Sequence, residues 1–436
     1  MDLPYLPNTD QDRQVMLRAI GVASAEELFQ DIPQRFRNPP LRLPSPLSEL
    51  ELRQEMEALA ERDLYPGKYA SFLGAGAYRH FIPAVVWAIA SRGEFLTSYT
   101  PYQPEVSQGT LQVAYEFQSA VCELLGMEAA NAGMYDGPTA LAEAALMACR
   151  VTHRYRVAVL DTVSPTYREV LETYARGQEI EVRQVPQKAV RLDAETACLV
   201  AQHPNFFGYL EELDALSVAA HKAGALLVTS VDPTAMGLFK PPGAFGADIA
   251  TAEGQPLGIP LSFGGPYVGL FASRQEHLRQ MPGRIVGRTR DGQGRTGYVL
   301  TLQTREQHIR RERATSNICT SEALVALACT VYVAALGKQG MQRVAELCYH
   351  KAHYAASEIA KLPGYSLPLS GTFFQEFVVR CPSPPAKVNE HLLERRIIGG
   401  LDVSDQVPQG MLLCVTEMNS RKEIDALVSA LAEVKG

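Results

Sequence analysis

Residues 246–269 read GADIATAEGQPLGIPLSFGGPYVG, two short apolar segments on either side of a loop crowded with glycine and proline. Residues 247–252 have the length and apolar character of a buried strand, and residues 268–272 show the same pattern. Glycine and proline in such density indicate a backbone held in tight turns. The stretch therefore predicts a strand, an ordered loop and a second strand.

An acidic residue follows the preceding strand of the chain. Residues 225–231 (ALLVTSV) are apolar and short, as expected of a buried strand, and they end in Asp232 and Pro233. In open α/β sheets, ligands bind in the crevice outside the carboxyl ends of the strands. Asp232 is therefore a candidate binding residue.

Strand and helix patterns alternate between residue 156 and residue 272. The predicted strands cover residues 157–160, 180–185 and 198–201, with amphipathic helices at 167–175 and 213–223. Alternation of this kind predicts an α/β fold, in which a mainly parallel sheet has helices on both faces.

This layout resembles the large domain of fold-type-I pyridoxal phosphate (PLP) enzymes, a three-layer α/β structure. In those enzymes an Asp after one strand pairs with the pyridine nitrogen, and a Lys after a later strand forms the Schiff base. Asp232 falls at the position of the Asp. Residues 253–257 read EGQPL, so Gln255 stands where the Lys is expected. Lys240 follows Asp232 by too few residues to replace it, and we expect a vestigial site with no covalent cofactor.

A capped helix is expected where such enzymes bind the cofactor phosphate. Residues 141–149 form an apolar helix that Asp136 or Thr139 can cap. Helix N-termini bind phosphate readily, but an acidic residue in that turn repels it. The sequence therefore favours an ordinary capped helix over a phosphate site.

Length and composition define the class of protein. The chain has 436 residues, 46% of them hydrophobic, with a net charge of −7, which disfavours nucleic-acid binding. Eight cysteines without a CxxC pair predict free thiols and no metal site, and no signal-peptide pattern occurs, so we expect a cytoplasmic protein. The apolar run at 323–336 is too short to cross a membrane and predicts a buried helix.

Breaks in composition suggest three parts. Prolines and polar residues dominate the start of the chain, whereas a smaller α+β pattern follows a long helical region near the end. We predict an N-terminal arm at residues 1–65, a large PLP-transferase-like domain at 66–330, and a linking helix with a small C-terminal α+β domain at 331–436.

Three long motifs, with a fourth in support, carry a more specific resemblance. Residues 5–33, 95–109 (FLTSYTPYQPEVSQG), 246–269 and 314–320 (ATSNICT) are similar to the N-terminal half of glycine decarboxylase, the P-protein of the glycine cleavage system. That family has two fold-type-I halves, on one chain or as separate subunits in an α2β2 assembly. The PLP lysine belongs to the C-terminal half, so the resemblance implies an α subunit whose missing lysine is expected.

The resemblance also implies a reaction and a set of partners. With glycine as substrate, PLP bound covalently by the β subunit serves as electron sink for the loss of CO2. The aminomethyl group then passes to the lipoyl arm of the H-protein, which makes the enzyme an oxidoreductase. We expect the isolated chain to be inactive and to contribute an active-site rim to its partner: Tyr99, Thr100, Tyr102, Gln103, Glu105, Thr315, Ser316 and Asn317.

A second hypothesis makes the chain a non-catalytic docking or allosteric platform for the carrier protein. It rests on a mixed-charge segment that is either an ion-paired helix face or a patch for an acidic partner. The segment carries Arg305, Glu306, Arg310, Arg311, Glu312 and Arg313.

Overall fold

The computed structural model describes residues 8–318 and 322–434, and its contacts divide the chain into two units, residues 1–63 and 64–436. Within the first unit, α1 (Asp10–Ile20) and α2 (Glu49–Ala60) each begin with a capping box, Thr9 with Asp12 and Ser48 with Glu51. These reciprocal hydrogen bonds explain why two helices form in a polar segment.

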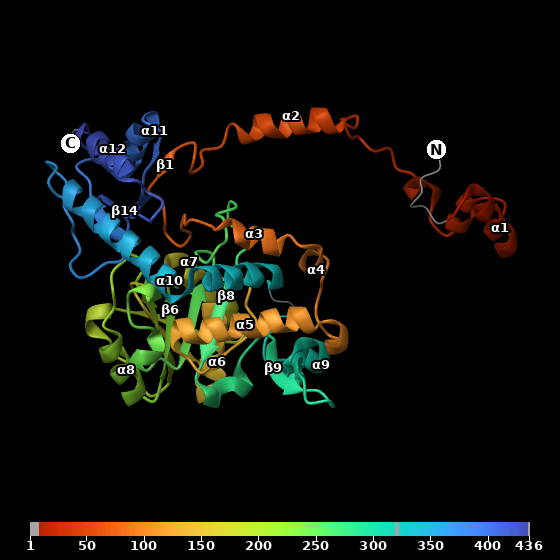
Figure 1. Cartoon of the computed structure of the whole chain (residues 1–436), viewed down its shortest axis with the longest axis horizontal. Coiled ribbons are helices and arrows are strands. Elements are labelled where there is room, and N and C mark those ends of the chain that lie inside the picture. The colour runs from red at the N-terminus through yellow and green to blue at the C-terminus, as the bar shows by residue number, and fades with distance from the viewer. Residues whose placement is uncertain (1–7, 319–321, 435–436) are drawn as a thin grey trace. The chain divides into compact units, whose positions relative to one another are not determined.

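A seven-stranded sheet forms the centre of the second unit (Figure 1). Its order is β2-β8-β7-β6-β5-β3-β4, and the run from β7 to β4 is parallel throughout, whereas β8 is antiparallel to both of its neighbours. The predicted, mainly parallel sheet is therefore confirmed. The strands are β2 (Ala129–Ala130), β3 (Arg156–Leu160), β4 (Glu181–Val185), β5 (Thr196–His203), β6 (Leu226–Val231), β7 (Ile249–Glu253) and β8 (Gly269–Ser273).

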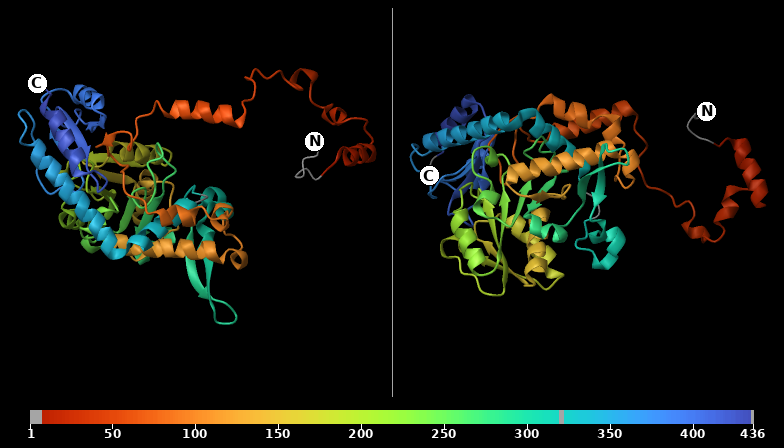
Figure 2. Two further views of the ribbon diagram at one scale, coloured as in Figure 1. Left: turned by 45° about the horizontal axis from the view of Figure 1, so that its top comes forward. Right: turned by 60° about the horizontal axis from the view of Figure 1, so that its bottom comes forward.

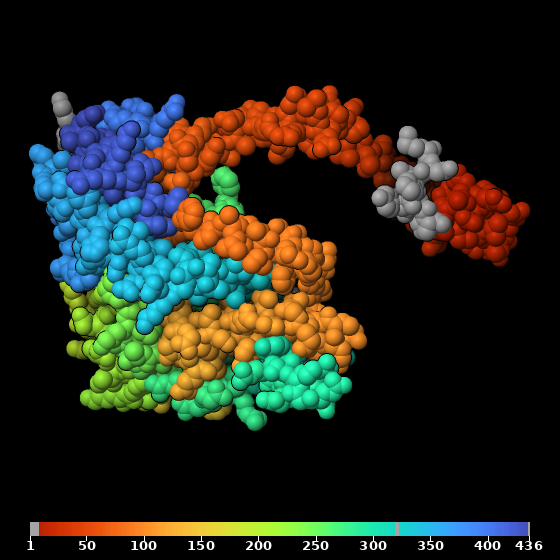
Figure 3. Space-filling model, in the orientation of Figure 1, coloured from red at the N-terminus to blue at the C-terminus, as the bar shows by residue number. Residues whose placement is uncertain are grey.

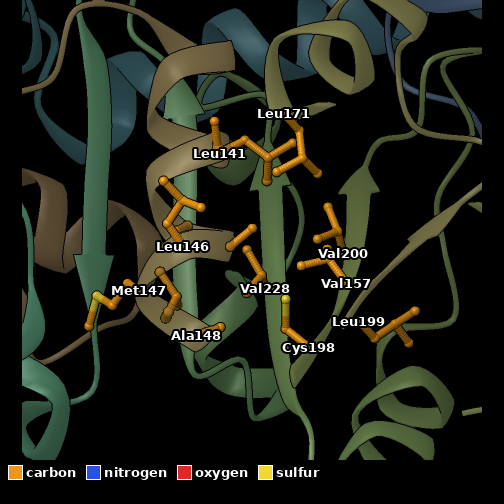
Figure 4. Close-up of a cluster of buried hydrophobic side chains, with 14 of the residues drawn as sticks. Leu141, Leu146, Met147, Ala148, Val157, Leu171, Cys198, Leu199, Val200 and Val228 are labelled. Carbon is orange, nitrogen blue, oxygen red and sulfur yellow. The ribbon is translucent and has the colours of Figure 1, made fainter. Parts of the chain in front are cut away.

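Helices cover both faces of this sheet and complete three layers. In β7, Ile249 packs in one apolar core with α6, whereas its neighbour Ala250 packs in another with α5 and α10. Successive strand residues point to opposite faces, so the two cores lie on opposite sides. Figure 4 shows the first, between α6 and the strands. The helices are α5 (Gln108–Leu125), α6 (Gly137–Thr152), α7 (Pro165–Arg176) and α8 (Leu213–Lys222).

One long helix, α10 (Ala323–Ile359), joins the sheet layer to the C-terminal part of the chain. Residues 323–336, predicted as a helix, form its first half, and the helix is interrupted at Gly337, with φ 59° and ψ −175°. Although α10 is long and apolar enough to span a bilayer by length and composition, its apolar residues pack into three apolar clusters of the protein. Figure 3 shows its first half between α3 (Ala84–Ala90) and α5.

A hairpin projects from the sheet domain. It comprises β9 (Ile285–Arg290) and β10 (Thr296–Thr301), paired antiparallel, with an exposed tip (Figure 2). The inner ends pack on α5 through Val286 and Leu300. The short helix α9 (Gln307–Arg310) follows the hairpin in sequence, and another short helix, α4 (Gly93–Leu96), precedes α5.

The C-terminal part forms a small α+β layer with its own apolar core. A three-stranded antiparallel sheet has the order β11-β14-β13, and a separate parallel pair joins β1 to β12. The strand pair means that residues 70–71 are held by the C-terminal layer. The elements are β1 (Ala70–Ser71), β11 (Glu376–Arg380), α11 (Pro385–Glu394), β12 (Ile397–Ile398), β13 (Leu401–Asp402), β14 (Gly410–Cys414) and α12 (Arg421–Ala432).

Truncating Leu141 should destabilise the sheet domain. Its side chain is fully buried between α6 and the sheet, and Leu→Ala changes at such sites cost about 2–5 kcal/mol through lost contacts and a residual cavity. Urea unfolding should show this loss for Leu141→Ala. The matched Leu393→Ala, 37% exposed on α11, should change the unfolding free energy by less than about 1 kcal/mol. Equal losses in both variants would contradict the proposed core.

Candidate functional site

The ends of β6 and β7 bring the expected site residues to one edge of the sheet. Asp232 follows β6 directly, and Gln255 lies two residues beyond β7. Beside Asp232 is a cavity of about 30 Å³, lined also by Glu253, Gln375 and Glu376. Pockets for small molecules usually measure about 300–1,000 Å³, so side chains fill most of the space that a cofactor would need.

Asp232 is partly buried and is hydrogen-bonded on both oxygens. Its Oδ1 accepts the backbone N–H of Thr234 at 2.8 Å, and its Oδ2 accepts Nε2 of Gln375 at 2.7 Å. Burial raises the pKa of Asp232, and the nearby His80 opposes that shift. Both oxygens of this side chain therefore have polar partners within the protein.

Gln255 is locked against the backbone of a distant segment. Its Oε1 accepts the N–H of Tyr78 at 2.8 Å, while its Nε2 donates to the carbonyls of Tyr78 at 2.8 Å and Ile259 at 2.9 Å. The side chain is 1% exposed. Gln255 is thus a structural clamp that holds residues near Tyr78 across the ends of the sheet.

The first turn of α6 is fully occupied by acidic side chains. Gly137 N–H donates to Glu253 Oε2 at 2.9 Å, Thr139 N–H donates to Asp136 Oδ1 at 2.8 Å, and Pro138 has no N–H. The predicted cap by Asp136 is confirmed. A phosphate at this helix terminus would find its donors already bonded and two carboxylates in its place.

Sequence reasoning missed two acidic residues of this region, Glu253 and Glu376. Glu376 accepts the N–H of Ala75 at 2.6 Å and the hydroxyl of Tyr78 at 2.7 Å, so it ties the same clamped segment to β11. Burial raises the pKa of Glu253 to about 8 and that of Glu376 to about 7. A glutamate inside the apolar run of residues 373–379 was the available signal.

These residues do not fit PLP. The pyridine partner Asp232 is present, but Gln255 cannot form a Schiff base and its amide is committed to backbone groups. The phosphate position holds Glu253 and Asp136, and the cavity is far smaller than the cofactor requires. Lys240 is exposed and is not among the cavity residues.

The expected rim residues lie elsewhere, in a loop that a buried arginine braces. Tyr102 Oη accepts Nη2 of Arg284 at 3.3 Å, and its ring contacts His308 with 5.4 Å between centroids. Arg284 also lies 3.7 Å from Glu306. Of the other predicted rim residues, Tyr99 and Thr100 line an apolar pocket of about 160 Å³, whereas Gln103 and Glu105 are exposed at a 3-10 turn.

The second group of predicted rim residues connects to the first through Arg305 and Glu306. Thr315 N–H donates to the carbonyl of Arg305, and Ser316 Oγ donates to Glu143 Oε1 of α6 at 2.6 Å. Asn317 is exposed. Burial raises the pKa of Glu143. None of the predicted rim residues lines the cavity beside Asp232. Residues 5–7 and 319–320 of the quoted motifs lie outside the described residues.

The mixed-charge segment is not a continuous helix face or a continuous surface patch. Arg305 is buried and donates from Nη2 to the carbonyl of Gly283 at 3.0 Å, and Glu306 is buried beside Arg284. Backbone breaks at Arg311, with φ 54°, divide the segment into short turns. Of its arginines, only Arg310, Arg311 and Arg313 are exposed.

Sequence comparison matches nearly the whole chain to one family. The family model for the glycine cleavage system P-protein matches residues 4–431. The chain belongs to the P-protein family of the glycine cleavage system.

The most similar relatives that we compared show which subunit of the P-protein this chain resembles. The chain is 54% identical to probable glycine dehydrogenase (decarboxylating) subunit 1 of Thermomicrobium roseum, over 98% of this chain and 99% of the relative. The protein of the same name from Desulfitobacterium hafniense is 52% identical, and the match covers 99% of this chain and 100% of that relative. The chain is accordingly a subunit of glycine dehydrogenase (decarboxylating), of the subunit 1 type.

Solved structures agree with this assignment. A crystal structure of glycine decarboxylase (P-protein) in inhibitor-bound form superposes with a TM-score of 0.93 at 44% identity, over 99% of this chain and 100% of that one. The sphingosine-1-phosphate lyase of Burkholderia pseudomallei superposes with a TM-score of 0.63 at 17% identity, and the match covers 92% of this chain and 94% of that one. The second likeness concerns the fold alone, and the predicted fold-type-I architecture is confirmed.

Restoring the lysine of the P-protein site should not restore cofactor binding. In Gln255→Lys, the first turn of α6 still carries Glu253 and Asp136, and the cavity keeps its size. We expect no aldimine absorbance after PLP is added and no lysine adduct after borohydride reduction. The wild-type chain serves as the matched control for surface lysines. A stable adduct mapped to position 255 would show that the pocket survives and that the anchor alone was lost.

Glu253 should make stability depend on pH. Its pKa rises from an ordinary 4.5 to about 8 on folding, so the folded state retains a proton that the unfolded state loses. The resulting stabilisation is complete below about pH 4.5 and is lost as the pH rises through 8. The melting temperature of Glu253→Gln should therefore fall less steeply over this interval than that of wild type. Glu172→Gln, an exposed control on α7, should keep the wild-type slope.

Proposed function

We propose that this chain is the cofactor-free half of glycine dehydrogenase (decarboxylating) and completes an active site whose PLP is bound covalently by subunit 2. The observation that carries the proposal is the first turn of α6, where Glu253 and Asp136 accept the hydrogen bonds that a phosphate would need. The clamp formed by Gln255 supports it independently.

The two subunits divide the work in an α2β2 assembly. The complete enzyme decarboxylates glycine, releases CO2 and transfers the aminomethyl group to the lipoyl arm of the H-protein. The PLP of the partner supplies the electron sink. This chain shapes the substrate entrance and excludes water from it. It cannot bind the cofactor itself, because Gln255 stands where the Schiff-base lysine is expected and acidic side chains occupy the helix terminus that would bind the phosphate.

The rim loop has the properties that such a role requires. Tyr99 is 81% exposed and so is available to a partner, while Tyr102 is held by Arg284 and His308. A buried, hydrogen-bonded support fixes an exposed side chain at low entropic cost. Because Arg284 also lies beside Glu306, one arginine orients both groups of rim residues.

A second candidate function is a docking or allosteric platform for the carrier protein. Three exposed arginines favour it, Arg310, Arg311 and Arg313, of which Arg313 lies 4.0 Å from Glu312. If docking were the only role, Arg310→Glu with Arg311→Glu would weaken H-protein binding and make its salt dependence shallower. Changes at Tyr102 would then leave turnover intact.

Reconstitution distinguishes the two functions. The purified chain alone should catalyse no exchange of CO2 into glycine, and subunit 2 alone should be inactive until this chain is added. With both subunits present, Tyr102→Phe should lower kcat/KM by about 10-fold, because the loop loses the hydrogen bond that positions it.

Tyr155→Phe provides the matched control, since Tyr155 is exposed and distant in sequence from the rim. It should leave kcat/KM unchanged. Full activity from subunit 2 alone would refute the proposed role, and an unaffected Tyr102→Phe enzyme with a weakened Arg310→Glu, Arg311→Glu enzyme would favour the docking platform.

A further inference from the structure

Nitrogen, sulfur and oxygen donors of three side chains meet in the interior of the second unit. His80 is close to the clamped Tyr78 in sequence, Cys348 lies on α10, and Glu417 lies in the loop after β14. One donor atom of each lies within 4.8 Å of those of the other two. The thiol is fully buried, and the side chains of His80 and Glu417 are 2% and 8% exposed. Imidazole, thiolate and carboxylate are the ligands that zinc takes in proteins.

Separation along the chain hides this cluster from the sequence, which predicts no metal site. Glu417 is 69 residues from Cys348 and 337 residues from His80. Metal sites are recognised in sequences by short spacings such as CxxC, and this chain has no such pair. Only the fold brings the three ligands together.

The carboxylate of Glu417 is the centre of the cluster. Its Oε2 lies 2.7 Å from Nδ1 of His80 and accepts the thiol of Cys348 at 3.4 Å. Zinc bonds of about 2.0–2.3 Å in tetrahedral geometry place neighbouring ligand atoms about 3.3–3.7 Å apart. The distance from carboxylate to sulfur already fits, and the distance from carboxylate to imidazole needs to widen by only about half an ångström.

The imidazole of His80 has no competing partner. Its Nε2 is buried and lacks a hydrogen-bond partner among the described residues, so the ring bonds there only through Nδ1, to Glu417. Nδ1 therefore points into the cluster. The proton of the neutral ring can reside on Nε2, which leaves the lone pair of Nδ1 for a metal.

Neighbouring groups hold the ligands in position. The second oxygen of Glu417, Oε1, accepts the N–H of Phe81 at 2.6 Å. Nζ of Lys351 donates to the backbone carbonyls of Glu417 at 2.6 Å and Asn419 at 2.7 Å, which fixes the loop after β14. Hydrogen bonds of this kind orient the ligands of metal sites. Because the ammonium of Lys351 is bonded to carbonyls, the carboxylate stays directed at His80 and Cys348.

We propose that His80, Cys348 and Glu417 bind one zinc ion and leave its fourth position to water. The sulfur of Cys348 bonds to zinc as the thiol proton passes to solvent, and the imidazole binds in its neutral form. The thiolate and the carboxylate balance the two positive charges of zinc, so the buried site is neutral overall. Magnesium and calcium are excluded, because they prefer oxygen ligands alone. The ion joins residues 78–81, α10 and the loop after β14, a structural role that does not depend on the proposed function.

Cobalt gives a spectroscopic test, because it occupies zinc sites and reports a bound thiolate. The full chain expressed with cobalt should retain one ion per chain and show a thiolate-to-cobalt charge-transfer band. Cys348→Ser should lose the band. Cys381→Ser, the matched control at another buried thiol of the C-terminal layer, should keep it. Absence of the band in the wild-type chain, or its persistence in Cys348→Ser, would overturn the proposal.

The unmodified chain provides a second test, in case Cys348→Ser fails to fold. Chain expressed with zinc and then desalted should retain one zinc ion by mass spectrometry. Its melting temperature should exceed that of chain refolded with a chelator by about 2–4 °C. Crystals should show an anomalous difference peak at the zinc edge between His80, Cys348 and Glu417. Chain without retained zinc, or a peak only at another position, would overturn the proposal.

Discussion

The hydrogen bonds between the carboxamide of Gln255 and the backbone of Tyr78 are the constraint on which the rest of the site depends. They fix the segment that carries the Tyr78 hydroxyl, and that hydroxyl bonds Glu376 of β11. Gln255 stands where a Schiff-base lysine is expected, and here it links the sheet to the C-terminal layer through the segment of Tyr78. Loss of the amide would leave a buried N–H and a buried carbonyl unpaired, which is costly in a low-dielectric interior.

Electrostatics explains why the first turn of α6 does not suit a phosphate. A helix N-terminus attracts anions, and here two acidic side chains of the chain itself occupy its donors, Asp136 at the cap and Glu253 from the end of β7. Burial raises the pKa of Glu253, so the folded protein favours its protonated form, and the Glu253 side chain already occupies the N–H of Gly137 that a phosphate would need.

Periodicity and capping made the fold predictable, because these signals are local. The alternation of strands and helices predicted the parallel sheet, and Asp136 was identified as a possible cap from its own turn. Contacts across long separations were not predictable: Glu253 meets Gly137 from 116 residues away, and Glu376 meets Tyr78 from 298. Arg305 was assigned to a charged surface because nothing near it in sequence reveals its carbonyl partner at Gly283. The place of Asp232 at the edge of the sheet was predictable, because it directly follows a strand pattern in the sequence.

The central claim is that this chain holds no PLP and that its partner holds all of it. The most direct test reduces the assembled enzyme with borohydride, separates the two subunits and measures the pyridoxyl label on each by mass spectrometry. The account predicts one label per subunit 2, on a lysine of that subunit, and none on this chain above the level of exposed lysines in the unassembled protein. A stoichiometric label on a lysine of this chain would contradict it.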